Sequence, residues 1–236
     1  MVYYTDGREE AALARAGLRK LAGLMSDAFM EHENWRRVIP DAARRKRALA
    51  AMFHFMAAVV NRYGHIVVTM DGGQRVGYTT FMVDADREQV SFRRVLRCGA
   101  LPSAVAFLLA LRPRELSVMR GFAKAVDGFQ SSVACDSGGL HLYSTAVDPA
   151  LKGRGLMKRS FAWAEERFKA AGFTSYSLET TDPANLPVYG RFGLSLVDTV
   201  TIPGTDRNVW FYRKEMGRGI QSDNRGRWIP TISRGT

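Results

Sequence analysis

A glycine-punctuated stretch, Val147 to Arg159, carries the residues best suited to hold an anion. Gly153 and Gly155 accept positive φ and lack a Cβ that would obstruct a ligand, so successive backbone N–H groups can converge on a phosphate. A helix that begins directly after them adds its N-terminal dipole and its unpaired donors. The stretch therefore predicts a phosphate-binding turn, although an ordinary strand-to-helix connection would have the same glycines.

The segments on either side of this turn predict the elements that hold it in place. Residues 141–147 form a strand, and apolar residues after the turn recur at helical steps with charged residues between them. This stripe comprises Met157, Phe161, Ala164, Phe168 and Ala171. Gly172 can cap the helix, and residues 176–180 form the next strand. Strand, crossover helix and strand together predict a βαβ unit with parallel strands.

The first 60 residues predict two amphipathic helices. Asp6 and Glu9 have the spacing of a capping box, and an apolar stripe from Leu18 to Phe29 follows. A second helix begins near Pro40, with its apolar stripe between Leu49 and Val60. We expect its arginine-rich start, residues 44–47, to lie on the solvated face.

Antiparallel strands and a helical insert are predicted between this region and the turn. The β-branched runs 65–70 and 76–83 flank a glycine turn, which is typical of a hairpin. Residues 84–137 are too long for a bare connection, and the segments 102–111 and 115–126 read as helices. We expect this insert to form one wall of a pocket.

The C-terminal part predicts a closing hairpin and a tail. Residues 196–202 and 208–213 read as two strands. Residues 217–236 are polar and basic, and we expect them to be flexible. The predicted organisation is therefore one domain, 1–216, followed by this tail.

Composition narrows the possible partners. The 236-residue chain has a formal net charge of +11, which suits a polyanionic cofactor, a nucleic acid or an anionic membrane. Cys98 and Cys135 are far apart and share no metal-like spacing with the histidines, so we predict neither a disulfide framework nor a bound metal. The N-terminus lacks a signal-peptide pattern, and the longest apolar run, residues 104–111, is too short to span a bilayer. No nucleic-acid motif is recognised. We therefore expect a cytoplasmic protein with neither a membrane nor a nucleic acid as partner.

Two motifs resemble the GNAT superfamily of acetyl-CoA-dependent N-acetyltransferases. The segment 145–156, TAVDPALKGRGL, resembles its acetyl-CoA motif, with Lys152 where Gln or Arg is usual and Met157 where a small residue is usual. The segment 185–193, NLPVYGRFG, is similar to the one that ends the GNAT core. Together with Leu178-Glu-Thr, its spelling looks like the puromycin N-acetyltransferase branch. The resemblance is good over residues 140–216 and weak before them.

The resemblance implies the fold and the binding residues. It implies an α/β (α+β) GNAT fold, with a mixed, mostly antiparallel twisted sheet, a central parallel βαβ unit and helices on both faces. It implies acetyl-CoA as cosubstrate. The residues implied to bind it are Ala146, Val147, Lys152, Gly153, Arg154, Gly155, Leu156, Met157 and Asn185. The backbone N–H of Val147 would hold the pantetheine or polarise the acetyl carbonyl.

Two side chains are implied to move protons. Tyr189 matches the GNAT tyrosine that protonates the departing sulfur. A primary amine with a pKa of about 10.4 is mostly ammonium at pH 7, so a base must take a proton before the amine attacks. Glu179 is the first candidate because it ends the strand beside the cleft, with Tyr143 and His141 as alternatives. A water chain could serve instead, and Glu179 could be a structural carboxylate paired with an arginine.

The expected function is acetyl transfer from acetyl-CoA to a small-molecule amine, by direct attack in a ternary complex, in a monomer or homodimer. Two other classes stay open. One is a GNAT-like domain that binds an acyl-CoA as a sensor without catalysis, and the other is a nucleic-acid-binding protein that uses the positive charge. The identity of the amine is not predicted.

Overall fold

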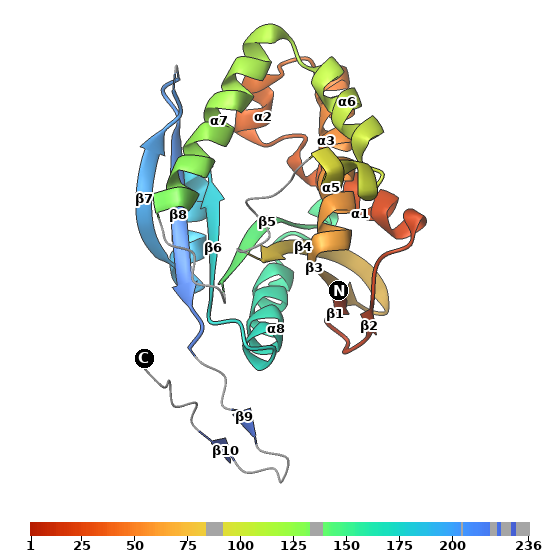
Figure 1. The fold of residues 1–236 in the computed structure, drawn as a ribbon, viewed down its shortest axis with the longest axis vertical. Coiled ribbons are helices and arrows are strands. Elements are labelled where there is room, and N and C mark those ends of the chain that lie inside the picture. Colours follow the sequence, from red (N-terminus) through yellow and green to blue (C-terminus); the bar gives the residue numbers. More distant parts are fainter. Residues whose placement is uncertain (84–91, 133–138, 204, 218–220, 223–227, 230–236) are drawn as a thin grey trace.

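The computed structural model describes residues 1–83, 92–132, 139–203, 205–217, 221–222 and 228–229. An eight-stranded mixed sheet has the order β2-β1-β3-β4-β5-β6-β8-β7 (Figure 1). Its strands are β1 (Val2–Tyr4), β2 (Glu9–Glu10), β3 (Gly64–Asp71), β4 (Gln74–Val83), β5 (Gly139–Val147), β6 (Ser175–Thr180), β7 (Ser195–Thr201) and β8 (Asn208–Glu215). β9 (Gln221–Ser222) and β10 (Trp228–Ile229) form a separate pair in the tail. The predicted fold class is confirmed.

Helices lie between the strands along the chain. The α-helices are α1 (Arg15–Phe29), α2 (Glu33–Val38), α3 (Ala42–Tyr63), α5 (Phe92–Arg97), α6 (Leu101–Ala110), α7 (Pro113–Ser132), α8 (Leu156–Ala170) and α9 (Leu186–Arg191). Two 3₁₀ turns, η1 (Pro149–Leu151) and η2 (Pro183–Asn185), precede α8 and α9. None of the helices in the described part of the chain is both long and apolar enough to cross a membrane.

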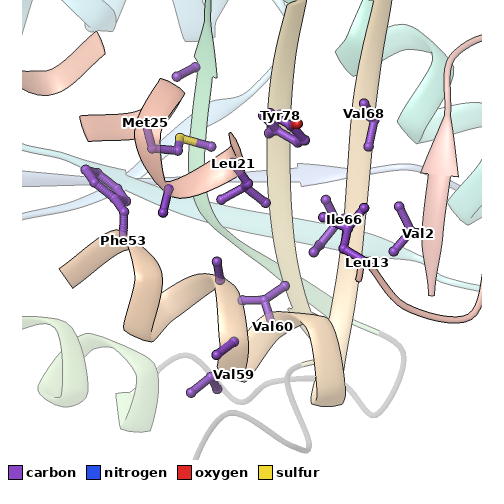
Figure 2. Packing of buried hydrophobic residues seen from close by; sticks show 14 of the residues in the cluster. Val2, Leu13, Leu21, Met25, Phe53, Val59, Val60, Ile66, Val68 and Tyr78 are labelled. Carbon is purple, nitrogen blue, oxygen red and sulfur yellow. The ribbon is translucent and has the colours of Figure 1, made fainter. Parts of the chain in front are cut away.

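The sheet has a hydrophobic core on each face, because successive side chains of a strand point to opposite sides. Ile66 and Val68 of β3 pack with α1 and α3, in the cluster drawn in Figure 2. Val67, between them, packs with Phe161 and Phe168 of α8 in a second cluster. Each of these three β3 residues is fully buried. The hydrophobic run of this strand is therefore that of a strand covered on both sides.

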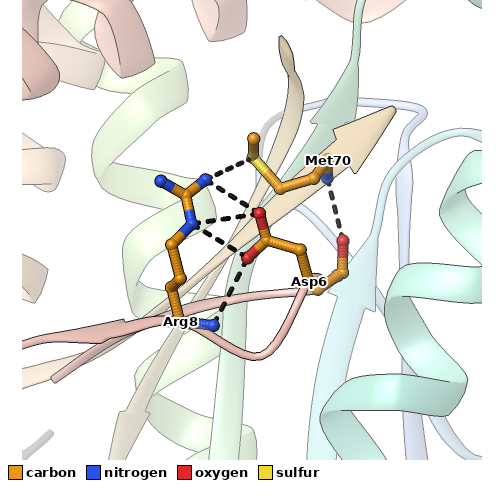
Figure 3. Close-up of polar contacts among 4 residues, drawn as sticks. Asp6, Arg8 and Met70 are labelled. Carbon is orange, nitrogen blue, oxygen red and sulfur yellow. Dashed lines mark hydrogen bonds and ion pairs between the residues drawn. The ribbon is translucent and has the colours of Figure 1, made fainter. Parts of the chain in front are cut away.

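The N-terminus departs from the sequence prediction. Asp6 does not cap a helix; it lies in the turn between β1 and β2, where its carboxylate accepts hydrogen bonds from the Arg8 guanidinium (Figure 3). The same turn is joined to β3 because the Met70 N–H donates to Thr5 Oγ1 at 2.9 Å. The predicted capping box is wrong, since a short-range side-chain pair and pairing of β1 with β3 compete with helix formation there. The helix begins at Arg15 instead.

The arginine-rich start of α3 is only partly solvated, which corrects the prediction for residues 44–47. Arg45 is 4% exposed and donates hydrogen bonds to the carbonyl oxygens of Met30 and Ile39. Arg44 forms a two-pronged ion pair with Glu115, at 2.9 and 2.5 Å. Guanidinium groups can be buried when their donors find acceptors of this kind. Only residues 46 and 47 are exposed as expected.

The predicted helical insert is confirmed for α6 and α7, while α5 was not predicted. α6 lies along α3, and α7 runs from there to the closing hairpin (Figure 1). Ala125 and Val126 of α7 pack against Ile202, Val209 and Phe211 of that hairpin. The insert therefore bridges the N-terminal helices and the far edge of the sheet. Its segments 84–91 and 133–138 lie outside the described residues.

The βαβ unit and the closing hairpin form as predicted. β5 and β6 pair in parallel, and β7 pairs with β8 in antiparallel. Gly172 follows the end of α8 with φ +91°, as a helix-ending glycine does. Ala171 is exposed, so the predicted buried stripe ends one turn earlier, at Phe168. The boundary between domain and tail at residues 216–217 stays a prediction.

Candidate active site

β5 and β6 form a fork at the centre of the sheet. They pair at only three positions, the last of them His141 with Ser177. Beyond this point β5 stays paired with β4, and the register shifts where Tyr143 forms a bulge. β6 stays paired with β8 instead. The backbone edges of Leu142 to Val147 and of Leu178 to Thr180 are therefore separated, and the glycine turn and α9 follow at their open ends.

The glycine turn has the backbone conformation that a phosphate-binding turn requires. Gly153 and Gly155 have φ of +86° and +71°, and Gly155 is the N-cap residue of α8. Among the described residues no side-chain hydrogen bond caps this helix at Gly155, so its first N–H groups can donate to a ligand. Leu156 is buried, and Met157 packs partly buried against the α8 side of the core. The Met157 side chain therefore lies on the core side, as the helical spacing predicted.

Positive side chains surround the turn. Lys152, Arg154 and Arg159 are exposed around it. Asp71, at the end of β3, lies 3.6 Å from the Arg154 guanidinium and 3.2 Å from that of Arg159. It holds the two guanidinium groups over the turn through weak, solvent-exposed pairs. Backbone donors, a helix N-terminus and exposed cations suit the diphosphate of a coenzyme A thioester.

The end of β5 offers a backbone donor to the fork. The Asp148 N–H donates to Val76 O of β4 at 2.7 Å. Because N–H groups alternate in direction along a strand, the N–H of Val147 points away from β4 and toward the fork. Ala146, the residue before it, is buried opposite Tyr78. The pantetheine-binding role that the resemblance implies for both residues stays a prediction.

Tyr189 lies in α9, at the open end of β6. Its side chain is 7% exposed and packs on the Tyr212 ring at a centroid distance of 5.6 Å. Burial raises the pKa of Tyr189, and the nearby carboxylates of Glu179 and Asp182 raise this pKa further. The phenol is therefore held in its protonated form.

Glu179 lies one residue before the end of β6, in contact with His141. His141 Nε2 and Glu179 Oε2 are 2.9 Å apart, but they are not aligned as a hydrogen bond. The His141 side chain is buried, and its Nδ1 lies 3.0 Å from Ser177 Oγ. Tyr143 packs edge-on against the His141 ring at 5.3 Å. The structure thus brings together the three residues considered as the base, and Glu179 is paired with a histidine rather than with an arginine.

Asn185 is engaged at the end of β6. Its side-chain amide donates to Thr180 Oγ1 at 3.1 Å, and the same oxygen accepts the Asp182 N–H. Asp182 in turn accepts the Ala184 N–H. Asn185 therefore orders the connection from β6 to α9, which is the connection that positions Tyr189.

A wall that the sequence did not predict closes over this connection from the N-terminal side. Asn34 Nδ2 donates to both oxygens of Thr181, at 2.6 and 2.7 Å, and His32 Nε2 lies 3.3 Å from Asp182. Burial lowers the pKa of His32 despite that carboxylate.

The segment that contains His32 and Asn34 also borders an open hollow of about 670 Å³. The hollow is lined by Glu31, Glu33, Arg36, Arg37, Pro40 and Arg45. The Asn34–Thr181 contacts join residues 147 positions apart, so no local pattern could have revealed them.

Comparison with known families decides the classification. Residues 27–194 match the model of the acetyltransferase (GNAT) family. The chain belongs to this family. The match begins at the end of α1 and spans α2, α3, the insert, the fork and α9, so it includes residues 27–139, where the motif resemblance was weak. No match was found among the curated proteins.

Solved structures with the same fold include two amine acetyltransferases. An arylalkylamine N-acetyltransferase 7 from the yellow fever mosquito has a TM-score of 0.56 at 14% identity, over 87% of this chain and 86% of that one. An agmatine N-acetyltransferase has a TM-score of 0.51 at 16% identity, over 86% of this chain and 97% of that one. An acetyltransferase from Agrobacterium tumefaciens is 23% identical with a TM-score of 0.31; that match covers 33% of this chain and spans 57% of the other chain's length. At these identities the similarity concerns the fold.

Proposed function

We propose that the protein transfers the acetyl group of acetyl-CoA to an amine of a small molecule. The observation that carries the proposal is the fork between β5 and β6. It has an uncapped, glycine-flanked helix N-terminus at the end of one strand, and a partly buried carboxylate and a buried phenol at the end of the other. Membership of the acetyltransferase (GNAT) family supports this assignment.

Binding of the cosubstrate follows the path of β5. Acetyl-CoA supplies the acetyl group as a thioester. The backbone of residues 153–157, with Lys152 and Arg154, would hold its diphosphate. Ala146 and the Val147 N–H would hold the pantetheine and the acetyl carbonyl, and Asn185 would order the opposite side of the fork. The exposed edge of β5 is the part of the sheet that can accept an extended ligand in this way.

The proposed chemistry needs one base and one acid. Glu179 would take a proton from the amine, whose nitrogen then attacks the carbonyl carbon while the carbon–sulfur bond breaks. Tyr189 would donate its proton to the departing sulfur. The raised pKa of Tyr189 suits this role because the proton stays on the phenol until the thiolate forms. The reaction is a direct attack in a ternary complex, with no acetylated enzyme.

The acceptor class rests on two observations. The segments Leu178-Glu-Thr and 185–189, NLPVY, favour the puromycin N-acetyltransferase branch of the family, whose spelling they resemble. Two proteins of the same fold are named for small amines, an arylalkylamine and agmatine. These two observations are the basis for proposing a small-molecule amine as acceptor.

Two measurements test the proposal. Acetyl-CoA should raise the melting temperature, because it binds the native state selectively, and no shift at millimolar concentration would remove the cosubstrate assignment. A thiol-release assay should then identify an acceptor among arylalkylamines, polyamines, amino acids and aminoglycoside or nucleoside amines. Tight acetyl-CoA binding without thiol release on any amine would favour a sensor module instead.

The base is tested separately. For the identified amine, Glu179→Gln should suppress the rise in rate with increasing pH, because the amide cannot accept the proton. A wild-type pH profile in this variant would assign the proton transfer to a water chain.

A further inference from the structure

His141 is a buried histidine at the exact point where the fork opens, and the proposed reaction gives it no role. It is the last β5 residue paired with β6, and its side chain is 3% exposed. Both ring nitrogens face polar atoms of β6, Ser177 Oγ at 3.0 Å and Glu179 Oε2 at 2.9 Å. A histidine that only filled space would not need two polar neighbours on alternate residues of the adjacent strand.

The chemistry of the two neighbours defines where the ring protons lie. An ionised carboxylate can only accept, so the nitrogen facing Glu179, Nε2, must carry a proton. A serine hydroxyl can donate or accept, so it suits Nδ1 in either the neutral or the charged ring. Ser177 therefore permits the one tautomer of neutral His141 that presents an N–H to Glu179. Ser177 thus orients the His141 ring, and the ring in turn orients Glu179, as a third group orients the base in a catalytic triad.

We propose that His141, held by Ser177, is a positioning residue that orients the Glu179 carboxylate toward the amine. The inference rests on the proposed function of Glu179 as base. Oε2 is buried and its 2.9 Å contact with Nε2 lacks hydrogen-bond alignment, so the carboxylate keeps an unshared lone pair in the free enzyme. Such pairs align when substrate is bound. His141 thus restrains the rotation of Glu179 through the buried Oε2 and leaves the other oxygen, Oε1, to accept the proton.

Other ionisable groups around this pair leave the role to His141. They are Tyr143 on β5, Tyr189 on α9, Asp182 after β6, Arg213 on β8 and His32 before α2. Tyr189 and Asp182 carry no positive charge, His32 pairs with Asp182, and Arg213 lies beside Ser177 and contacts Ser175 and Glu215. His141 contacts Glu179 directly, with its Nε2 2.9 Å from Oε2.

The experiment compares two isosteric replacements of His141. The amide nitrogen of glutamine can take the place of Nε2, whereas that of asparagine can take only the place of Nδ1. His141→Gln should retain turnover within about fivefold, and His141→Asn should lose about 10- to 100-fold, as expected for a misplaced catalytic group. In His141→Asn the acidic limb of the pH profile should move to higher pH, because loss of the facing N–H favours the protonated carboxyl. Affinity for coenzyme A should stay unchanged in both.

Ser177→Ala and Ser175→Ala provide a second, matched pair on the same face of β6. Ser177→Ala should move the acidic limb in the same direction as His141→Asn, while Ser175→Ala, whose hydroxyl contacts Arg213, should leave it in place. If His141→Asn does not fold, this pair of serine variants tests on its own whether His141 positions Glu179.

Each outcome bears on one of two statements. If Glu179→Gln abolishes the pH dependence but the His141 and Ser177 variants keep the wild-type profile, the positioning role is refuted and the proposed base stands. Equal losses of turnover in His141→Gln and His141→Asn, matching the fraction of each protein that no longer binds coenzyme A, would likewise mean a purely structural histidine. If Glu179→Gln itself keeps the wild-type profile, the proposed base and the positioning role both fail.

Discussion

Replacing the two glycines that flank α8 separates a folding role from a binding role. Gly155 precedes the helix with φ +71°, and Gly172 follows it with φ +91°. Neither position has a heavy atom within 4 Å of an added Cβ. Gly155→Ala and Gly172→Ala therefore introduce the same backbone strain and no clash in the free protein.

The magnitudes follow from these two facts. An alanine in the left-handed region costs about 1–2 kcal/mol, so both variants should lose this amount of unfolding free energy. Only at Gly155 does the new Cβ enter the turn that would face the diphosphate. Loss of one hydrogen bond to a charged group costs about 1.5–3 kcal/mol, and each 1.4 kcal/mol is tenfold in affinity. Gly155→Ala should therefore weaken coenzyme A binding about 10- to 100-fold.

Titration calorimetry with coenzyme A and chemical denaturation measure the two quantities on the same samples. Gly172→Ala should bind coenzyme A as the wild type does while being as destabilised as Gly155→Ala. Equal affinity in both variants would refute the assignment of the glycine turn as the diphosphate site. A large loss of stability in only one of them would refute the reasoning from backbone strain.

Three further predictions concern single side chains. Tyr189→Phe should lower the turnover number about 100-fold with unchanged coenzyme A affinity, because a general acid is lost; unchanged turnover when chemistry limits the rate would exclude Tyr189 as the acid. Glu115→Ala should cost about 3–5 kcal/mol of unfolding free energy, because it leaves the Arg44 guanidinium without its partner. As a control, Arg47→Ala, at an exposed position, should cost under about 0.5 kcal/mol. Similar losses in the two variants would mean that the Arg44 guanidinium lies in solvent. Burial lowers the pKa of His65 to about 4, so its protonation is disfavoured in the folded state, and the unfolding free energy should fall as pH drops from about 6.5 to 4. His65→Phe should reduce this pH-dependent loss by up to about 3 kcal/mol. An unchanged slope of unfolding free energy against pH would contradict the role given to His65.

The sequence predictions that were confirmed rest on features that a few neighbouring residues determine, such as backbone φ and helical spacing. The glycines at 153 and 155 take positive φ because no other residue does so without strain, and the α8 stripe is buried because its spacing matches a helix. The hairpin of β3 and β4 and the closing hairpin form for the same reason. The fold class and the GNAT family were predicted from the resemblance of the segments 145–156 and 185–193 to GNAT motifs, and both are confirmed.

Predictions failed where a distant contact outweighed the local pattern. Asp6 and Glu9 have the spacing of a helix cap, yet pairing of β1 with β3 places this segment at the sheet. Arg44 and Arg45 have the sequence context of a solvated face, yet Glu115 of α7 and the carbonyl groups of Met30 and Ile39 bury them. Hydrogen-bond acceptors far along the chain decide whether a charge can be buried, and periodicity contains no information about them.

The sequence by itself determined the glycine turn, the helix behind it, and Glu179 and Tyr189 as candidates for proton transfer. Only the tertiary structure decided that Glu179 contacts His141, that Ser177 holds that histidine, and that Asn34 and His32 close over the end of β6. The reason is geometric. Backbone conformation is specified within a few residues, whereas the environment of a titratable side chain is assembled by strands and helices that meet only when the sheet has formed.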